Sequence, residues 1–383
     1  MTTSISNGSN RQNLGIETAP HLKATITTQK IMAIVAVSLI PALFVQVFFF
    51  GFGILWQFII SVFTATLCEI IISLLRHRKI IHSLSDLSYV VTALILAFTL
   101  PPLLPCYYTV VASIFAIVVV KSVFGGLGHN IFNPAMAGFI FIVISCPQAM
   151  TNTWVVPAPY ACNEASLQNT YNVIFSTADP VDLKNRIEGL NSNEPTDDDE
   201  SRLISSSIVD SFSGATYLES IKSARKTSSL DVQPGHDFTN GNYRAYLALA
   251  IAYGLGALVL AFFRIILIKM VFAFVISFAL IQGLMHHLYP GNFINITDGF
   301  LFGGTLIAAF YIITDPVTNA GTSKGRIYFS ILVAFLIIFL RAFGSYSDAV
   351  AFAVMLGNAC APLIDVLTHR RPYGFGYKKG GFQ

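Results

Sequence analysis

Charged residues are scarce in this chain of 383 residues: Asp, Glu, Lys and Arg make up 11% of it, against about a quarter in soluble proteins. Hydrophobic residues make up 54%. This imbalance excludes an ordinary soluble domain and predicts an integral membrane protein in contact with lipid. The net charge of +3 comes from Lys and Arg beside apolar runs, and no basic groove with interleaved aromatics is present, so nucleic acid is not an expected partner.

Motifs of soluble enzymes and metal sites are also lacking. The five cysteines form no CxxC pattern, and the chain has no phosphate loop and no Ser/His/Asp spacing. We therefore expect neither a metal centre nor a soluble type of catalytic site. Cys146 and Cys162 fall in or beside one loop, and the sequence leaves open whether they form a disulfide, because pairing cannot be read from sequence.

The N-terminal segment lacks the features of a signal peptide. Residues 1–19 are polar and rich in Ser, Thr and Asn, and no charged start leads directly into an apolar run. We expect a disordered tail there.

Apolar runs long enough to approach the roughly 30 Å hydrocarbon core of a bilayer occur in two sets of five. They cover residues 31–50, 53–75, 87–100, 107–123 and 135–145, then 243–263, 265–286, 299–313, 327–343 and 349–366. A long polar insert separates the two sets. The sequence thus predicts an all-α integral membrane protein with about ten transmembrane helices.

The positions of Lys and Arg predict the orientation of these helices, because short cytoplasmic loops hold most of the positive charge. With the N-terminus inside, the cytoplasmic side receives Lys23, Lys30, Arg76, Arg78, Lys79, Lys121, Arg264, Lys269, Lys324, Arg326, Arg370, Arg371, Lys378 and Lys379. The short outer loops are nearly bare of Lys and Arg, with Arg341 the main exception. Both termini are therefore predicted to be cytoplasmic and the insert to be outside.

Similar segments recur in the two halves. Residues 92–98 (Thr-Ala-Leu-Ile-Leu-Ala-Phe), followed by Pro101, resemble residues 305–310 (Thr-Leu-Ile-Ala-Ala-Phe), followed by Pro316. Since each half holds an odd number of spans, two copies would face opposite ways and form an inverted repeat. The alternative is chance similarity between apolar helices.

These patterns divide the chain into five regions. We expect a cytoplasmic tail (1–30), a first five-helix membrane repeat (31–145), a periplasmic insert (146–242), a second five-helix repeat (243–366) and a basic cytoplasmic tail (367–383).

Two polar breaks at matching places in the halves are candidates for an ion pathway. They are residues 125–134, where Asn133 precedes Pro134, and residues 314–321, which contain Asp315. Backbone that leaves helical hydrogen bonding at membrane depth can line a site. The alternative is that both breaks are tight turns in which Asn133 and Asp315 act as caps.

The insert contains the motif that carries the most chemistry. Residues 210–219 read Asp-Ser-Phe-Ser-Gly-Ala-Thr-Tyr-Leu-Glu. Thr216 and Glu219 fit a capping box at a helix start, which on its own is a structural interpretation. A helix start also presents free amide donors that favour a phosphate, and the preceding Ser213, Gly214 and Ala215 are small. An anionic cofactor is permitted there but not required.

Residues 210–216 match the flavinylation motif of Asp, two variable residues, Ser or Thr, Gly, Ala and Thr. The resemblance extends to residues 121–135, 313–317, 362–365 and 371–374. Together they resemble the family that contains the D subunit of the Rnf (Rsx) ion-translocating complex and the B subunit of the sodium-pumping NADH:quinone oxidoreductase.

This resemblance implies that Thr216 is joined through a phosphoester to flavin mononucleotide (FMN) by a flavin transferase. The motif residues Asp210, Ser213, Gly214 and Ala215 would direct that reaction. It also implies two inverted five-helix repeats, an inner-membrane location, and the A, B, C, E and G subunits as partners. Electrons would start from NADH or ferredoxin and reach this flavin through the G subunit. A second, non-covalent riboflavin and a role in keeping a redox-sensing transcription factor reduced are further implications.

Two functions from different classes follow. The first is a redox subunit that couples electron transfer to Na⁺ or H⁺ translocation. The second is an inverted-repeat solute transporter or channel without a redox cofactor, in which Thr216 is only a helix cap. Membrane architecture by itself cannot separate them.

Overall fold

The computed structural model describes residues 27–126, 128–175, 180–189, 241–290, 292–344 and 349–369, and in these ranges all regular structure is helical. The motif at residues 210–216 and the two terminal tails lie outside the described residues. The first half comprises α1 (Thr28–Ser38), α2 (Ile40–Phe50), α3 (Gly53–Leu75), α4 (Ile80–Leu84), α5 (Ser88–Thr99), α6 (Cys106–Ile114), η1 (Phe115–Val123) and α7 (Pro134–Ser145).

The described part of the insert and the second half are also built from helices. The insert contributes α8 (Pro147–Asn152), α9 (Ala161–Glu164), α10 (Leu167–Phe175) and α11 (Pro180–Gly189). The second half comprises α14 (Gly241–Phe262), α15 (Ile268–Leu288), α16 (Ile296–Leu301), α17 (Thr305–Ile307), η2 (Ala308–Ile312), α18 (Ser323–Phe343) and α19 (Val350–Thr368).

The helices confirm the prediction of a multi-pass membrane protein. Seven helical segments in the described residues are long and apolar enough to cross a membrane, and α5 and α7 are shorter apolar helices. Every apolar run expected from the sequence lies on helical structure. The number of helices that cross the bilayer and the inverted relation of the halves stay predictions.

Two of the expected spans are interrupted. The run 31–50 is divided at Leu39 into α1 and α2, where Pro41 in the first turn of α2 lacks an amide donor. The run 299–313 is divided into α16, α17 and η2, because Gly303 and Gly304 both take positive φ values of 70°.

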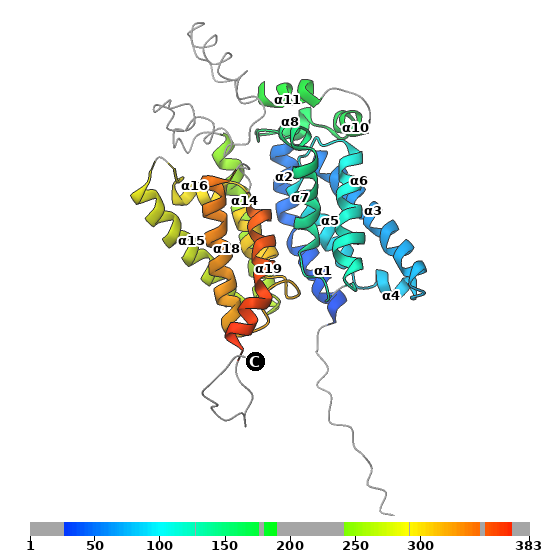
Figure 1. Cartoon of the computed structure of the whole chain (residues 1–383). Coiled ribbons are helices and arrows are strands. Elements are labelled where there is room, and N and C mark those ends of the chain that lie inside the picture. Colours follow the sequence, from blue (N-terminus) through cyan, green and yellow to red (C-terminus); the bar gives the residue numbers. More distant parts are fainter. Residues whose placement is uncertain are drawn as a thin grey trace, which may run out of the picture.

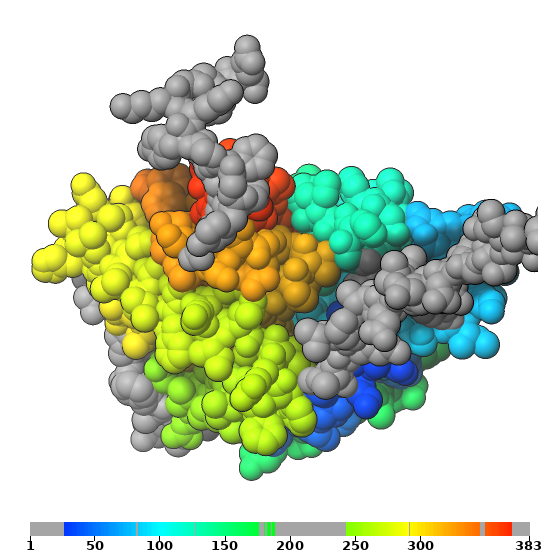
Figure 2. Space-filling view, turned by 90° about the horizontal axis from the view of Figure 1, so that it is seen from below, coloured from blue at the N-terminus to red at the C-terminus, as the bar shows by residue number. Residues whose placement is uncertain are grey.

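The two halves lie side by side, and the insert helices α8, α10 and α11 cover one end of the first half (Figure 1). The start of α1 and the end of α19 lie at the opposite end of the bundle from α8, α10 and α11. Seen from the end that holds these chain ends, α19 lies beside the first half near the middle of the molecule (Figure 2). This agrees with its packing against α7.

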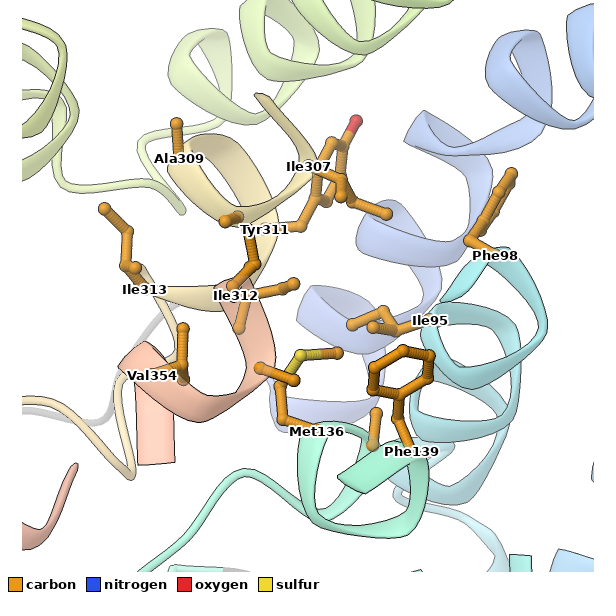
Figure 3. Packing of buried hydrophobic residues seen from close by; sticks show 14 of the residues in the cluster. Ile95, Phe98, Met136, Phe139, Ile307, Ala309, Tyr311, Ile312, Ile313 and Val354 are labelled. Atoms are coloured by element: carbon orange, nitrogen blue, oxygen red, sulfur yellow. The ribbon is translucent and has the colours of Figure 1, made fainter. Parts of the chain in front are cut away.

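One hydrophobic core joins the halves. Ile95 of α5 and Phe139 of α7 lie opposite Ile312 of η2, and Val354 of α19 completes the group (Figure 3). All four side chains are buried. Because helices from both halves build this core, neither half buries its apolar surface alone.

The first part of the insert rests on the membrane domain. Trp56 at the start of α3 donates from its indole N–H to the carbonyl of Leu167, 3.2 Å away, and its ring contacts Tyr171 and Phe175 of α10. Leu103 shares a small buried cluster with residues of the insert. These contacts attach α9 to α11 to one end of the bundle.

Candidate functional site

The motif at residues 210–216, for which the sequence predicts flavin attachment, lies outside the described residues. It contains the predicted site residues Asp210, Ser213, Gly214, Ala215 and Thr216. The other predicted site residues, Asn133 and Asp315, belong to the two backbone breaks, and the structure describes both.

The first break is a glycine-rich loop that ends in a capped helix. Gly125, Gly126 and Gly128 have φ values of 121°, 100° and 93°, which side chains with a Cβ rarely adopt. The Asn133 side chain accepts hydrogen bonds from the amides of Ala135, at 3.0 Å, and Met136, at 3.4 Å. Asn133 is therefore the N-cap of α7, as the sequence indicated.

The second break is held by acidic side chains. Asp315 lies in the turn after η2 and accepts hydrogen bonds from the Val317 amide at 3.3 Å and the Thr318 hydroxyl at 3.0 Å. Burial raises the pKa of the Asp315 carboxyl, whereas these two hydrogen bonds act in the opposite direction. Asp315 thus shapes its own turn, and its role in an ion pathway stays a prediction.

Asp365 on α19 holds the end of the same loop. Its carboxylate accepts hydrogen bonds from the amides of Gly321 at 2.9 Å and Thr322 at 3.1 Å. Thr322 in turn caps α18 by accepting from the Gly325 amide at 3.0 Å. The start of α18 is therefore fixed from α19 through a charge-assisted pair of bonds.

Asn358 of α19 joins the two breaks. The Asn358 side-chain amide is oriented so that its oxygen and nitrogen both have hydrogen-bond partners. The oxygen accepts from the backbone amide of Asn133 at 3.1 Å, and the nitrogen donates to the backbone carbonyl of Thr318 at 3.1 Å. Asn358 is 1% exposed. The sequence placed the two loops at matching positions, and the structure brings them together through this side chain.

A second polar group is buried within the first half. Lys121 of η1 forms an ion pair with Glu69 of α3 and donates to the Ser88 hydroxyl at 2.7 Å. Ser88 donates onward to the Asp86 carboxylate at 2.9 Å. Lys121 is thus buried at the end of η1, where its ammonium group compensates the buried Glu69 carboxylate, and its place on the cytoplasmic side stays a prediction.

Arg341, the exception in the charge pattern, also has a structural role. Its guanidinium donates to the carbonyls of Gly299 at 2.9 Å and Phe302 at 3.2 Å, and to that of Gly303 at 2.8 Å. These carbonyls lie around the end of α16, where the regular helical hydrogen bonding stops. Arg341 therefore caps the interrupted span, which gives this exception to the charge pattern a structural reason.

The cysteines take part in no disulfide. All five are free, including Cys146 and Cys162, so the pairing that the sequence left open is absent. Among the described residues, no group of three or more His, Cys, Asp or Glu side chains could hold a metal ion.

Sequence reasoning missed Asn358, Asp365 and the Glu69–Lys121 pair as organising residues. A signal existed for two of them. Glu69 is an acidic residue within the apolar run 53–75, which by itself indicates a buried partner. Asp365 belongs to a segment on which the family resemblance rests. Asn358 carried no such signal, because its partners are backbone groups far away in the chain.

Comparison with known proteins identifies the family. A family model described as "NQR2, RnfD, RnfE family" matches residues 15–374. The chain is 35% identical over 361 residues to the D subunit of the ion-translocating oxidoreductase complex of Shewanella frigidimarina, covering 94% of this chain and 97% of that protein. It is 34% identical over 364 residues to the D subunit of the same complex in Tolumonas auensis, covering 94% and 99%. The chain belongs to the NQR2, RnfD, RnfE family.

Proposed function

We propose that this protein is the D subunit of an ion-translocating oxidoreductase complex and couples electron transfer, from NADH or ferredoxin, to movement of Na⁺ or H⁺. The relatives that bear this name match the chain over almost their whole length. It is a component of a translocase, and the complete reaction requires the other subunits.

The observation that carries the redox assignment is the motif at residues 210–216 within a chain that matches the family from residue 15 to 374. We propose that FMN is bound covalently to the Thr216 hydroxyl through its phosphate. Asp210, Ser213, Gly214 and Ala215 form the recognition motif of the flavin transferase. When bound, the flavin supplies the ability to accept and pass on electrons.

The chain's own residues would position the flavin. Thr216 supplies the hydroxyl, and the small residues before it leave space for a planar group. A helix start at Thr216 would direct free amides toward the phosphate. The helix α10, which precedes the motif, is attached to one end of the bundle by the Trp56 contacts, and α11 packs against α9 and α10.

The proposed topology places the motif across the membrane from the chain ends. The start of α1 and the end of α19 lie at the same end of the bundle, and α8 to α11 lie at the other (Figure 1). We propose that the first end faces the cytoplasm and the insert faces the periplasm, in the bacterial inner membrane. The many Lys and Arg residues near the first end support this orientation.

The proposed partners are the A, B, C, E and G subunits of the complex, with the G subunit passing electrons to the flavin. Surrounding lipid and the flavin transferase complete the set. A non-covalent riboflavin and a contribution to keeping a redox-sensing transcription factor reduced belong to the same proposal.

Fluorescence of the denatured protein tests the flavin. The chain is produced with its flavin transferase, separated under denaturing conditions and viewed under ultraviolet light. We expect a fluorescent band that Thr216→Ala abolishes and that Thr196→Ala, a control within the same insert, leaves unchanged. A dark wild-type band, or fluorescence that survives Thr216→Ala, would favour a transporter or channel without a redox cofactor.

A further inference from the structure

Polar side chains line the interface between α3 and the continuous segment α6–η1. Every fourth residue of α3 takes part (Gln57, Ser61, Ala65 and Glu69), and so does every fourth residue of α6–η1 (Thr109, Ser113, Ile117 and Lys121). This spacing keeps each set on one helix face. We call these eight residues, six of which are polar, the polar seam; Ala65 and Ile117 are its apolar members.

The two ends of the polar seam are fixed by side-chain contacts. The Thr109 hydroxyl donates to the Gln57 amide oxygen at one end, and Lys121 pairs with Glu69 at the other. Both pairs are separated by the same number of residues in the chain. Ser61 and Ser113, one turn from the Gln57–Thr109 pair on their helices, therefore lie at one level of the interface.

Both serine hydroxyls are buried without a protein partner. Ser61 is 0% and Ser113 2% exposed, and neither Oγ atom has a hydrogen-bond partner among the residues that the structure describes. A serine in a helix can donate to the carbonyl four residues earlier, as Ser330 does to Arg326 at 2.9 Å. An unsatisfied buried hydroxyl is costly, so these two call for a further partner.

Packing of the helix pair does not explain the two serines. In the other half, the helices of the second and fourth apolar runs, α15 and α18, also pack against each other. There the buried face of α15 carries Met270, Phe274 and Phe278, with Gln282 at its end. The buried face of α15 thus carries no hydroxyl, and the buried Ser330 of α18 has a backbone partner, the Arg326 carbonyl.

We propose that internal water binds between Ser61 and Ser113. Water is the ligand that fits two neutral hydroxyls, because each can both donate and accept. Buried water in proteins typically bonds to polar groups that lack another partner. The site extends the Gln57–Thr109 pair by one turn toward the ion pair. Ala65, Cys68 and Ile117 form an apolar cluster beyond it, so the water is enclosed rather than part of an open channel.

The sign of a stability change tests the proposal in the purified complex. If water satisfies the hydroxyls, Ser61→Ala and Ser113→Ala each lower the midpoint of thermal unfolding, because hydrogen bonds are lost. If the hydroxyls are unpaired, each substitution raises the midpoint by removing an unsatisfied group. Ser330→Ala, which removes a buried hydroxyl with a known partner, gives the size of an ordinary loss.

The double variant tests whether one water site serves both serines. A shared site predicts that Ser61→Ala with Ser113→Ala lowers the midpoint by less than the sum of the single effects. A raised midpoint in either single variant, or a density map of the complex that resolves other internal waters but shows none between these serines, overturns the proposal. The test does not depend on the flavin, whose band fluorescence is measured separately.

Discussion

The helices formed by the second and fourth apolar runs of each half pack in different ways. The polar seam of α3 with α6–η1 contains an ion pair, a Gln–Thr hydrogen bond and two serines. The buried face of α15, a helix that packs against α18 and α16, instead carries the rings of Phe274 and Phe278, whose centroids lie 5.9 Å apart. We call it the aromatic seam. The two halves thus place similar helices together with opposite chemistry.

This difference shows what holds membrane helices together in one chain. In lipid, helices associate through close packing and through hydrogen bonds between them, and either can predominate. The aromatic seam depends on volume. The polar seam depends on the pairing of each polar group, since an ion pair away from water is tolerated only when both charges are compensated. Substitutions should therefore affect the two seams through different physical terms.

The largest expected effect is in the polar seam. Lys121→Met leaves the Glu69 carboxylate buried without its partner and should destabilise the protein by about 3–5 kcal/mol. Detergent-solubilised protein unfolded with a denaturant measures the loss.

The matched variant is Glu69→Gln combined with Lys121→Met, which removes both charges. It should recover most of the lost stability, because a neutral pair avoids the desolvation cost. If the double variant is as unstable as Lys121→Met alone, the charge explanation is wrong.

The aromatic seam should respond to volume. Phe278 is fully buried against Phe274 and Phe300, so Phe278→Ala should create a cavity and cost about 3 kcal/mol. Phe278→Leu, which keeps most of the volume, should cost less than half as much in the same unfolding measurement. Equal losses for the two variants would mean that ring contacts, and not volume, stabilise this seam.

The smallest expected effects compare one glutamine in each seam. Gln57 donates to the carbonyls of Pro102 and Leu104 and accepts from Thr109, whereas Gln282 donates to the carbonyl of Ile294. Gln57→Leu should cost about 2 kcal/mol and Gln282→Leu about 1 kcal/mol, since more groups lose a partner in the first case. The reverse order in unfolding experiments would contradict the contrast between the seams.

The sequence predicted the helices better than their interruptions. The apolar run 53–75 coincides with α3, and the other runs fall within a few residues of their helices. Composition is sufficient there, because a bilayer admits little else than a helix. The division of residues 299–313 required knowledge of tertiary contacts, since Arg341 compensates the freed carbonyls from a helix later in the chain.

The candidate site was predictable only in part. The capping of α7 by Asn133 could be read locally from the Asn-Pro pair. The burial of Lys121 could not, because a lysine at a helix end usually remains in a polar environment and its partner Glu69 lies on another helix. The bond from Asn358 to Thr318 depends on a backbone carbonyl, for which sequence gives no signal.

The position of Asn358 has a thermodynamic consequence. One side chain on a continuous helix binds both backbone breaks, and Asp365, seven residues later, holds the second break again. A displacement of either loop must break one of these bonds or carry α19 with it. By linkage, the coupling that α19 provides is reciprocal: the free energy by which the present form of one loop favours that of the other is the same in both directions. The two halves are therefore joined by the hydrogen bonds of Asn358 as well as by their shared apolar core.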